Sequence, residues 1–177
     1  PEKPGKYFPR IALEEWREWL GYTDVPGENS RISAEKIAEL RHGYYAATSY
    51  TDAQVGKVLD KLDELGLKEN TIIVLWGDHG FHIGEHDLWG KLTNFEICAR
   101  APLILAVPRQ KKAGQKTDAL VEFVDIYPTL AEAAGLAIPK GLEGISMLPV
   151  VADPDRSWKK AAFSQFPRPI SYNFTKN

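Results

Sequence analysis

Cysteine is almost absent from this sequence. Cys98 is the single cysteine among 177 residues, which excludes an intramolecular disulfide and a zinc site built from several thiolates. No apolar run approaches the ~20 residues that cross a bilayer, and the opening residues, PEKPGKYFPR, contain no signal-peptide hydrophobic region. These absences do not fix the compartment, because a mature secreted protein and an internal fragment would both look this way.

An excess of charge of either sign is also lacking. The chain carries 22 Lys and Arg residues against 24 Asp and Glu, a formal net charge of −2. Such a balance argues against nucleic acid and against an anionic membrane surface as partners. The hydrophobic content of 44% and charged content of 26% are ordinary for a globular protein, and this length suffices to bury a core.

Several catalytic signatures are missing. The sequence contains no P-loop, no Gly-x-Gly-x-x-Gly, no His-Glu-x-x-His and no Gly-x-Ser-x-Gly. Cys98 lies just before an apolar run, which favours a buried structural thiol over a reactive one. The residues alone therefore identify no nucleophile.

The most informative stretch that is present is TIIVLWGDHGFHIGEHDLWGK, residues 71–91. It begins with six mostly apolar residues, typical of one buried strand, and continues directly into Asp78 and His79. Two further histidines, His82 and His86, follow closely. Ligands of open α/β sheets bind outside the carboxyl ends of the strands. We interpret the stretch as a functional site; a polar surface turn is the alternative.

Helix and strand patterns alternate along the chain. Apolar residues at three- and four-residue steps predict a helix from Ala34 to Leu65 that ends at Gly66. Gly43 and Gly56 weaken this pattern, so a bent helix, or two helices with the second capped by Thr51, is the alternative. The apolar run 102–107 predicts a second strand, and Asp125 is expected to cap a further helix. Weaker patterns predict a helix at 11–20 and strands at 119–124 and 161–166. This alternation favours an α/β fold with a mainly parallel sheet flanked by helices.

The polar residues after the first strand suit a metal and an anion. On a turn, Asp78 and His79 can reach one ion; carboxylates suit calcium, magnesium or manganese, and imidazole suits zinc, manganese or iron. Two ligands do not complete a site, so further ligands must come from other segments. Lys91 adds a positive charge, and a metal with a lysine can clamp a phosphoryl or sulfuryl group. An ordinary surface lysine is the alternative.

Several blocks of the sequence resemble sulfatases of the alkaline-phosphatase superfamily, and among them the iduronate-2-sulfatase group. The most specific block is GDHGFHIGEHDLWGKLTNFE, followed by APLILAVP. YYAATSYTDAQVGKVLDKLDELGLKENTIIV precedes it, and LVEFVDIYPTLAEAAGL and AAFSQFPRP follow in the order of the family. The resemblance runs from about Ile37 to Pro169 and implies an alkaline-phosphatase-like fold.

The resemblance also implies roles for individual residues. Asp78 and His79 match the strand-end metal ligands of the family, with calcium the expected ion and Mg²⁺ or Mn²⁺ the alternatives. Lys91 matches the lysine that binds the sulfate. The family motif transfers no role to His82 or His86; we consider His82 as a residue that faces the substrate and His86 as a support for the loop.

The chain departs from the family in one large respect. The paired N-terminal aspartates and the Cys/Ser-x-Pro-x-Arg motif, whose first residue becomes the formylglycine nucleophile, are absent, and Cys98 does not fit that motif. We therefore interpret residues 1–177 as an incomplete C-terminal portion of a sulfatase domain, inactive alone, whose partner is the N-terminal part. Its expected parts are a lead-in helix and loop (1–32), a helix-strand core (33–138) with the metal-site loop 77–94, and an irregular end (139–177).

The expected activity is hydrolysis of sulfate esters, those of sulfated sugars first, in the periplasm or outside the cell, as the resemblance implies. Two alternatives remain open. One is a phosphonate monoester or phosphodiester hydrolase of the same superfamily. The other is a non-catalytic fragment or binding module, because the nucleophile motif is absent.

Overall fold

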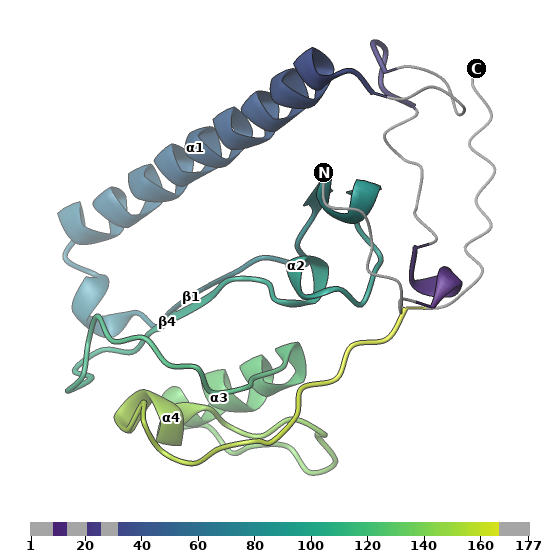
Figure 1. Cartoon of the computed structure of the whole chain (residues 1–177). Coiled ribbons are helices and arrows are strands. Elements are labelled where there is room, and N and C mark those ends of the chain that lie inside the picture. The colour runs from purple at the N-terminus through teal and green to yellow at the C-terminus, as the bar shows by residue number, and fades with distance from the viewer. Residues whose placement is uncertain (1–8, 14–20, 26–31, 167–177) are drawn as a thin grey trace. The chain divides into compact units, whose positions relative to one another are not determined.

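The computed structural model describes residues 9–13, 21–25 and 32–166, and the chain divides into two compact units (Figure 1). Unit 1 comprises residues 1–58, 77–102 and 164–177, and unit 2 comprises residues 59–76 and 103–163. The candidate metal-site loop therefore lies entirely within unit 1. The subdivision at residues 32 and 138 stays a prediction.

One long helix, α1 (Ala34–Glu64), forms where the apolar periodicity predicts it. The hydroxyl of Ser33 accepts a hydrogen bond from the Lys36 N–H at 3.2 Å, which satisfies one of the free donors of the first turn. Gly66, with φ 66°, follows the end of the helix in the left-handed conformation that glycine adopts without strain. The predicted helix is thus confirmed as one continuous element.

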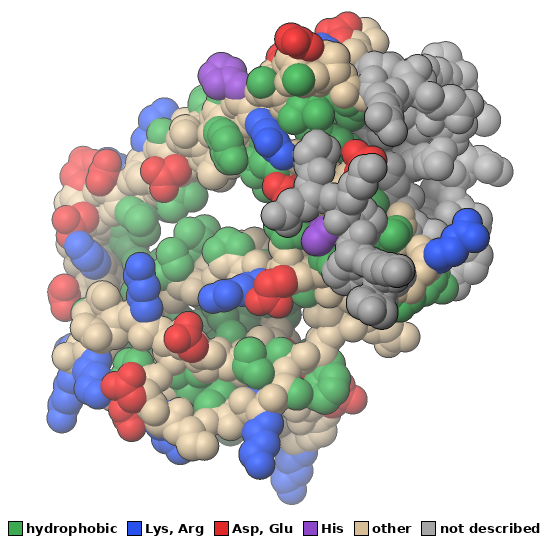
Figure 2. Space-filling view, in the orientation of Figure 1, with side chains coloured by type: hydrophobic (Ala, Val, Ile, Leu, Met, Phe, Trp, Pro, Cys, Tyr) green, Lys and Arg blue, Asp and Glu red, His purple; other side chains and the backbone are tan. Residues whose placement is uncertain are grey.

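The apolar side chains of α1 are not fully buried within the described residues. Figure 2 shows apolar side chains between charged ones on this helix. The large exposed apolar residues of the helix are Tyr44, Tyr45, Tyr50, Val58 and Leu59. In the part of the chain that the structure describes, no helix is long and apolar enough to cross a membrane.

The two predicted strands are present but pair in an unexpected direction. β1 (Ile73–Trp76), reached through the 3-10 helix η3 (Lys68–Asn70), runs antiparallel to β4 (Leu103–Ala106). A parallel pair needs a crossover, usually a helix of a dozen residues, and the connection here contains only the four-residue α2 (Glu96–Ala99). No parallel pair occurs within residues 32–166, so the parallel ladders of the expected sheet are not seen.

Unit 2 contains three further helical elements. The 3-10 helix η5 (Phe123–Asp125) leads into α3 (Ile126–Ala133), as predicted from Asp125, and α4 (Leu148–Ala152) follows. The strands predicted at 119–124 and 161–166 are wrong. The Glu122 and Phe163 amides donate to the carboxylates of Asp125 and Glu122, respectively, and not to a neighbouring strand.

At the other end of the described chain, the 3-10 helix η1 (Arg10–Leu13) overlaps the start of the helix predicted at 11–20. Residues 14–20 lie outside the described part of the chain.

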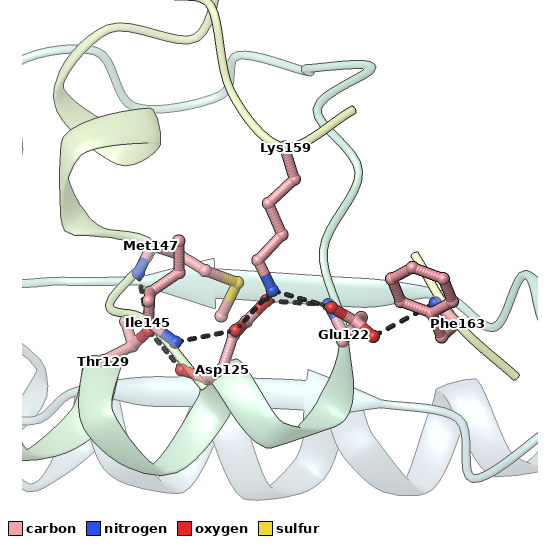
Figure 3. Close-up of polar contacts among 7 residues, drawn as sticks. All are labelled: Glu122, Asp125, Thr129, Ile145, Met147, Lys159 and Phe163. Atoms are coloured by element: carbon pink, nitrogen blue, oxygen red, sulfur yellow. Dashed lines mark hydrogen bonds and ion pairs between the residues drawn. The ribbon is translucent and has the colours of Figure 1, made fainter. Parts of the chain in front are cut away.

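A buried carboxylate connects the parts of unit 2 (Figure 3). Asp125 is 0% exposed, and its two oxygens lie 2.8 and 2.7 Å from the Lys159 ammonium. They also accept hydrogen bonds of 2.9 Å from the backbone amides of Glu122 and Ile145. The start of α3 is thereby tied to the segment before α4 and to the segment after it.

The charged forms of Lys159 and Glu122 stabilise each other. Burial alone would lower the pKa of Lys159, but the hydrogen bonds that its ammonium donates to Asp125 and Glu122 outweigh burial and raise the pKa above 10.5. The hydrogen bond from Lys159 is the main cause that lowers the pKa of the Glu122 carboxyl, and the Phe163 amide adds to it. Lys159 and Glu122 are therefore charged at neutral pH.

Candidate functional site

The candidate site is a loop that leaves β1 and returns to β4. Backbone hydrogen bonds close its base: the Gly77 N–H donates to the Pro102 carbonyl at 3.0 Å, and the Gly80 N–H donates to the Cys98 carbonyl at 2.9 Å. Cys98 is 1% exposed, as expected of a structural thiol. The first residues after β1 are thus held in place by the far end of the same loop.

Gly80 is required by this closure. A Cβ atom there would overlap the backbone carbonyl group of Ile97, and that carbonyl cannot move far without disturbing the adjacent hydrogen bond to Cys98.

We expect Gly80→Ala to lower the free energy of unfolding by about 1–3 kcal/mol, through the overlap of a new side chain with backbone. The matched control is Gly43→Ala, because Gly43 lies in the interior of α1 with open space around its Cα. The control should raise the free energy of unfolding by about 0.5–1 kcal/mol. Urea unfolding measures both; equal stability of the two variants would contradict the close approach.

A short hairpin forms the outer part of the loop. β2 (His82–Ile83) runs antiparallel to β3 (Trp89–Gly90), with His82 opposite Gly90 and Ile83 opposite Trp89. The 3-10 helix η4 (Glu85–Asp87) makes the turn. Within it His86 and Asp87 have φ values of 56° and 64°, a left-handed conformation that is costly for residues other than glycine.

Two side chains hold this strained turn. The Arg41 Nε of α1 donates to the Ile83 carbonyl at 2.8 Å, and a Glu85 carboxylate oxygen accepts a hydrogen bond of 2.7 Å from the Ile83 amide. Sequence reasoning did not single out Arg41, because a contact between residues 42 positions apart leaves no local pattern. The turn is therefore fixed both from α1 and from within.

Asp78 and His79, the predicted metal ligands, lie together at the base of the loop. His79 Nδ1 lies 2.8 Å from the Gly80 carbonyl oxygen, so in the neutral ring Nδ1 carries the hydrogen and Nε2 keeps its lone pair. This Nε2 lies 3.4 Å from Asp78 Oδ2, and the Asp78 side chain is 85% exposed. The pair thus presents one nitrogen and one oxygen acceptor to the same accessible space.

The geometry of this pair fits two neighbouring ligands of one divalent ion. Two bonds of about 2.3–2.6 Å at a right angle separate their ligand atoms by about 3.3–3.7 Å, which includes the observed distance. The carboxylate suits calcium or manganese and the imidazole suits manganese or zinc, so the pair alone permits a hard or a borderline divalent ion. Among the described residues, no third His, Cys, Asp or Glu joins the pair, so the remaining ligands must come from elsewhere.

His82 is not where the sequence-based interpretation placed it. Its side chain is 1% exposed, and its Nε2 lies 2.9 Å from the hydroxyl of Thr93, which is itself 1% exposed. A ring buried in this way does not face a substrate, and we withdraw that role. No sequence signal pointed to Thr93, since a His–Thr contact across a hairpin has no characteristic spacing.

His86 lies within the hairpin turn, and Lys91 lies just after the hairpin. The His86 ring stacks on Phe95 with ring centres 4.7 Å apart, and it approaches the His82 ring at 6.2 Å. This packing is what a loop-supporting role requires, and the role stays a prediction. Lys91 directly follows β3 and is half-buried.

The burial of His82 makes stability depend on pH. Desolvation is the main cause that lowers the pKa of His82 below 6.5 in the folded protein, while the Glu85 carboxylate opposes it. When the pH is lowered below about 6.5, His82 binds a proton more readily in the unfolded chain than in the folded protein. The free energy of unfolding should therefore decrease as the pH decreases, by up to about 1.4 kcal/mol per pH unit. The loss ends below the pKa of the folded state.

Urea unfolding between pH 5 and pH 8, in steps of about half a unit, tests this expectation, with His82→Asn as the comparison. The variant should show a weaker dependence of the free energy of unfolding on pH than the wild type. Equal dependence in both proteins would mean that a group other than His82 causes it.

Comparison with known proteins places these residues in a family. The Sulfatase family model matches residues 8–136. Iduronate 2-sulfatase of Mus musculus is 36% identical over 161 residues, which cover 75% of this chain and 29% of that protein. The chain thus spans about 30% of the length of this curated relative.

Two solved structures are similar to the chain in fold as well as in sequence. One is BT4656 in complex with its substrate D-glucosamine-2-N,6-O-disulfate, with TM-score 0.66, 33% identity, and coverage of 77% of this chain and 32% of that chain. The other is the phosphonate monoester hydrolase SpPMH from Silicibacter pomeroyi, with TM-score 0.69, 31% identity, and coverage of 74% and 26%. The family match and these similarities confirm the α/β, alkaline-phosphatase-like fold expected from the sequence, and the chain belongs to the sulfatase family.

Proposed function

We propose that the protein containing this chain hydrolyses sulfate esters of sulfated sugars, and that the chain supplies two metal ligands and one sulfate-binding residue to its active site. The observation that carries the proposal is the contact between His79 Nε2 and Asp78 Oδ2 at 3.4 Å, directly after β1. The Gly80 carbonyl fixes the ring so that Nε2 keeps its lone pair.

Each of the three residues has a defined task in this proposal. Asp78 Oδ2 and His79 Nε2 hold a divalent ion, calcium first and Mg²⁺ or Mn²⁺ as alternatives, and the bound ion supplies positive charge next to the sulfate. The Lys91 ammonium binds a sulfate oxygen and neutralises charge that grows on it as the ester bond breaks. The nucleophile, a formylglycine, belongs to another part of the same domain.

The names of two relatives support the proposed substrate class. The mouse relative is an iduronate 2-sulfatase, and BT4656 was solved with a sulfated glucosamine. We therefore propose a sulfated saccharide, iduronate-like first, and a site of action in the periplasm or outside the cell. A chain that binds without cleaving remains the alternative if the rest of the domain lacks a nucleophile.

A specific observation favours a second candidate. The TM-score of 0.69 to the phosphonate monoester hydrolase is as high as the 0.66 to BT4656, at similar identity. The same three residues would then hold a metal and a phosphonate or phosphodiester oxygen. Metal preference and substrate distinguish the two candidates.

Metal binding gives the first test. The purified full-length protein, in which this chain is joined to the rest of its domain, should contain one calcium per active site. Asp78→Asn and His79→Gln should each weaken calcium binding about 100-fold, since the loss of a ligand or of its charge lowers affinity. His42→Gln is the matched control, because His42 lies exposed on α1. Metal analysis and calorimetric titration of the chelator-treated protein measure the effect.

Unchanged calcium affinity in both site variants would contradict the ligand assignment. Restoration of activity by Mn²⁺ but not by Ca²⁺, together with turnover of a phosphonate ester and not of a sulfate ester, would favour the second candidate.

A further inference from the structure

We propose that His82 and Thr93 form a buried positioning pair that fixes Lys91 in the place where it binds the sulfate. The inference rests on the proposed function, because it concerns how the hairpin holds that lysine. His82 and Thr93 are each 1% exposed, and a hydrogen bond of 2.9 Å joins them. Neither side chain is accessible to a substrate, so both act through the backbone that carries Lys91.

His82 contacts the backbone before Lys91 and, through Thr93, the backbone after it. His82 lies opposite Gly90 in the ladder between β2 and β3, and Gly90 immediately precedes Lys91. Through its ring, His82 also holds Thr93, two residues after Lys91. One residue of β2 thus fixes the backbone before the lysine and the backbone after it.

The segment between these two anchors is strained and needs them. Leu92, between Lys91 and Thr93, has φ 65°, a left-handed conformation that is unfavourable for a residue with a side chain. Such a conformation persists only when its surroundings enforce it. Loss of the hydrogen bond at Thr93 removes one restraint on this conformation, and relaxation of Leu92 towards negative φ would displace Lys91.

The environment of the pair makes its hydrogen bond strong and its loss costly. The Phe95 ring lies edge-on to the His82 ring with centres 5.6 Å apart, and the Cys98 thiol lies 3.8 Å from the Gly90 carbonyl oxygen. The hydrogen bond of Nε2 with Thr93 and the packing against Phe95 together orient the ring. In such a low-dielectric setting, removal of one partner leaves a buried polar atom unsatisfied.

The test is a double-mutant cycle on kcat/KM for a sulfate monoester, in the full-length protein with its formylglycine. Thr93→Val removes the hydroxyl at nearly constant volume and should lower kcat/KM about 10–100-fold, the effect of a displaced binding group. In a Lys91→Ala background the same change should cost less than about twofold, because the residue it positions is gone. Thr93→Ser keeps the hydroxyl and should restore most of kcat/KM.

The cycle separates positioning from a general loss of structure. Equal fold-losses with and without Lys91, or full activity of Thr93→Val, would overturn the inference. His82→Asn, run in the same cycle, should give the same coupling to Lys91, and all variants are assayed below the lowest Tm measured among them. If Lys91→Ala itself leaves kcat/KM unchanged, the proposed function fails; if only the coupling is missing, the positioning pair fails.

Discussion

Replacing Lys91 by alanine is expected to lower kcat/KM for a sulfate monoester by about 10²–10³-fold, which corresponds to about 3–4 kcal/mol of lost transition-state stabilisation. The reason is electrostatic: charge grows on the sulfate oxygens as the ester bond breaks, and a fixed ammonium in a site of low dielectric opposes that charge strongly. Lys91 directly follows β3 and precedes the strained Leu92, so its backbone position is well defined.

The measurement is sulfate release from an aryl sulfate by the full-length protein after formylglycine formation. Lys57→Ala is the matched control, because Lys57 lies exposed on α1, where its ammonium donates a hydrogen bond to the neighbouring Gln54. It should retain wild-type kcat/KM. Lys91→Arg keeps the charge but not the shape of the ammonium, and we expect an intermediate loss. Wild-type activity of Lys91→Ala would remove Lys91 from the site.

Much of the fold could be predicted because it follows from local pattern. The apolar steps along α1 and the glycine after it fix a helix almost to the residue, and the runs at β1 and β4 give two strands. Their antiparallel pairing could not be read from the apolar runs, which look alike in either direction. It follows from the short connection between them, which lacks a crossover helix.

The two wrongly predicted strands also show the limit of local pattern. Residues 119–124 and 161–166 have strand-like composition, yet Glu122 and Phe163 donate their backbone amides to carboxylate side chains. Such a partner satisfies a backbone donor as well as a neighbouring strand does, and no local pattern in the sequence distinguishes the two.

The candidate site, like the fold, could be predicted only where it depends on residues adjacent in the sequence. Asp78 and His79 are adjacent in sequence, and their contact at 3.4 Å follows from that adjacency and from the turn after β1. The pairing of His82 with Thr93 depends on the register of the hairpin, and the contact of Arg41 with Ile83 depends on the packing of α1. Adjacent pairs could be predicted; contacts made by folding could not.

The largest effect on stability is expected at the buried pair of Asp125 and Lys159. Lys159→Met should lower the free energy of unfolding by about 3–5 kcal/mol, because it leaves the carboxylate of Asp125, which is 0% exposed, without its cation. Asp125→Ala should be at least as costly, since the amides of Glu122 and Ile145 lose their acceptor as well.

An exposed ion pair provides the matched control. Lys112 and Asp153 lie 3.5 Å apart, with side chains 48% and 55% exposed. Lys112→Met should therefore cost less than about 1 kcal/mol, because solvent screens the pair and each charge is hydrated without the other. Urea unfolding of the three variants measures the differences in free energy.

The double variant Lys159→Met with Asp125→Asn tests whether the cost comes from the uncompensated charge. Asparagine is neutral and still accepts a hydrogen bond from the amide of Glu122 or Ile145 through its one carbonyl oxygen, so the double variant should be more stable than Lys159→Met alone. If the two changes simply add, the charge is not the cause, and the loss of packing around the lysine stem is. A cost at Lys159 no greater than at Lys112 would mean that solvent reaches Asp125, and the tie between α3 and the segment after α4 would then contribute little to the stability of unit 2.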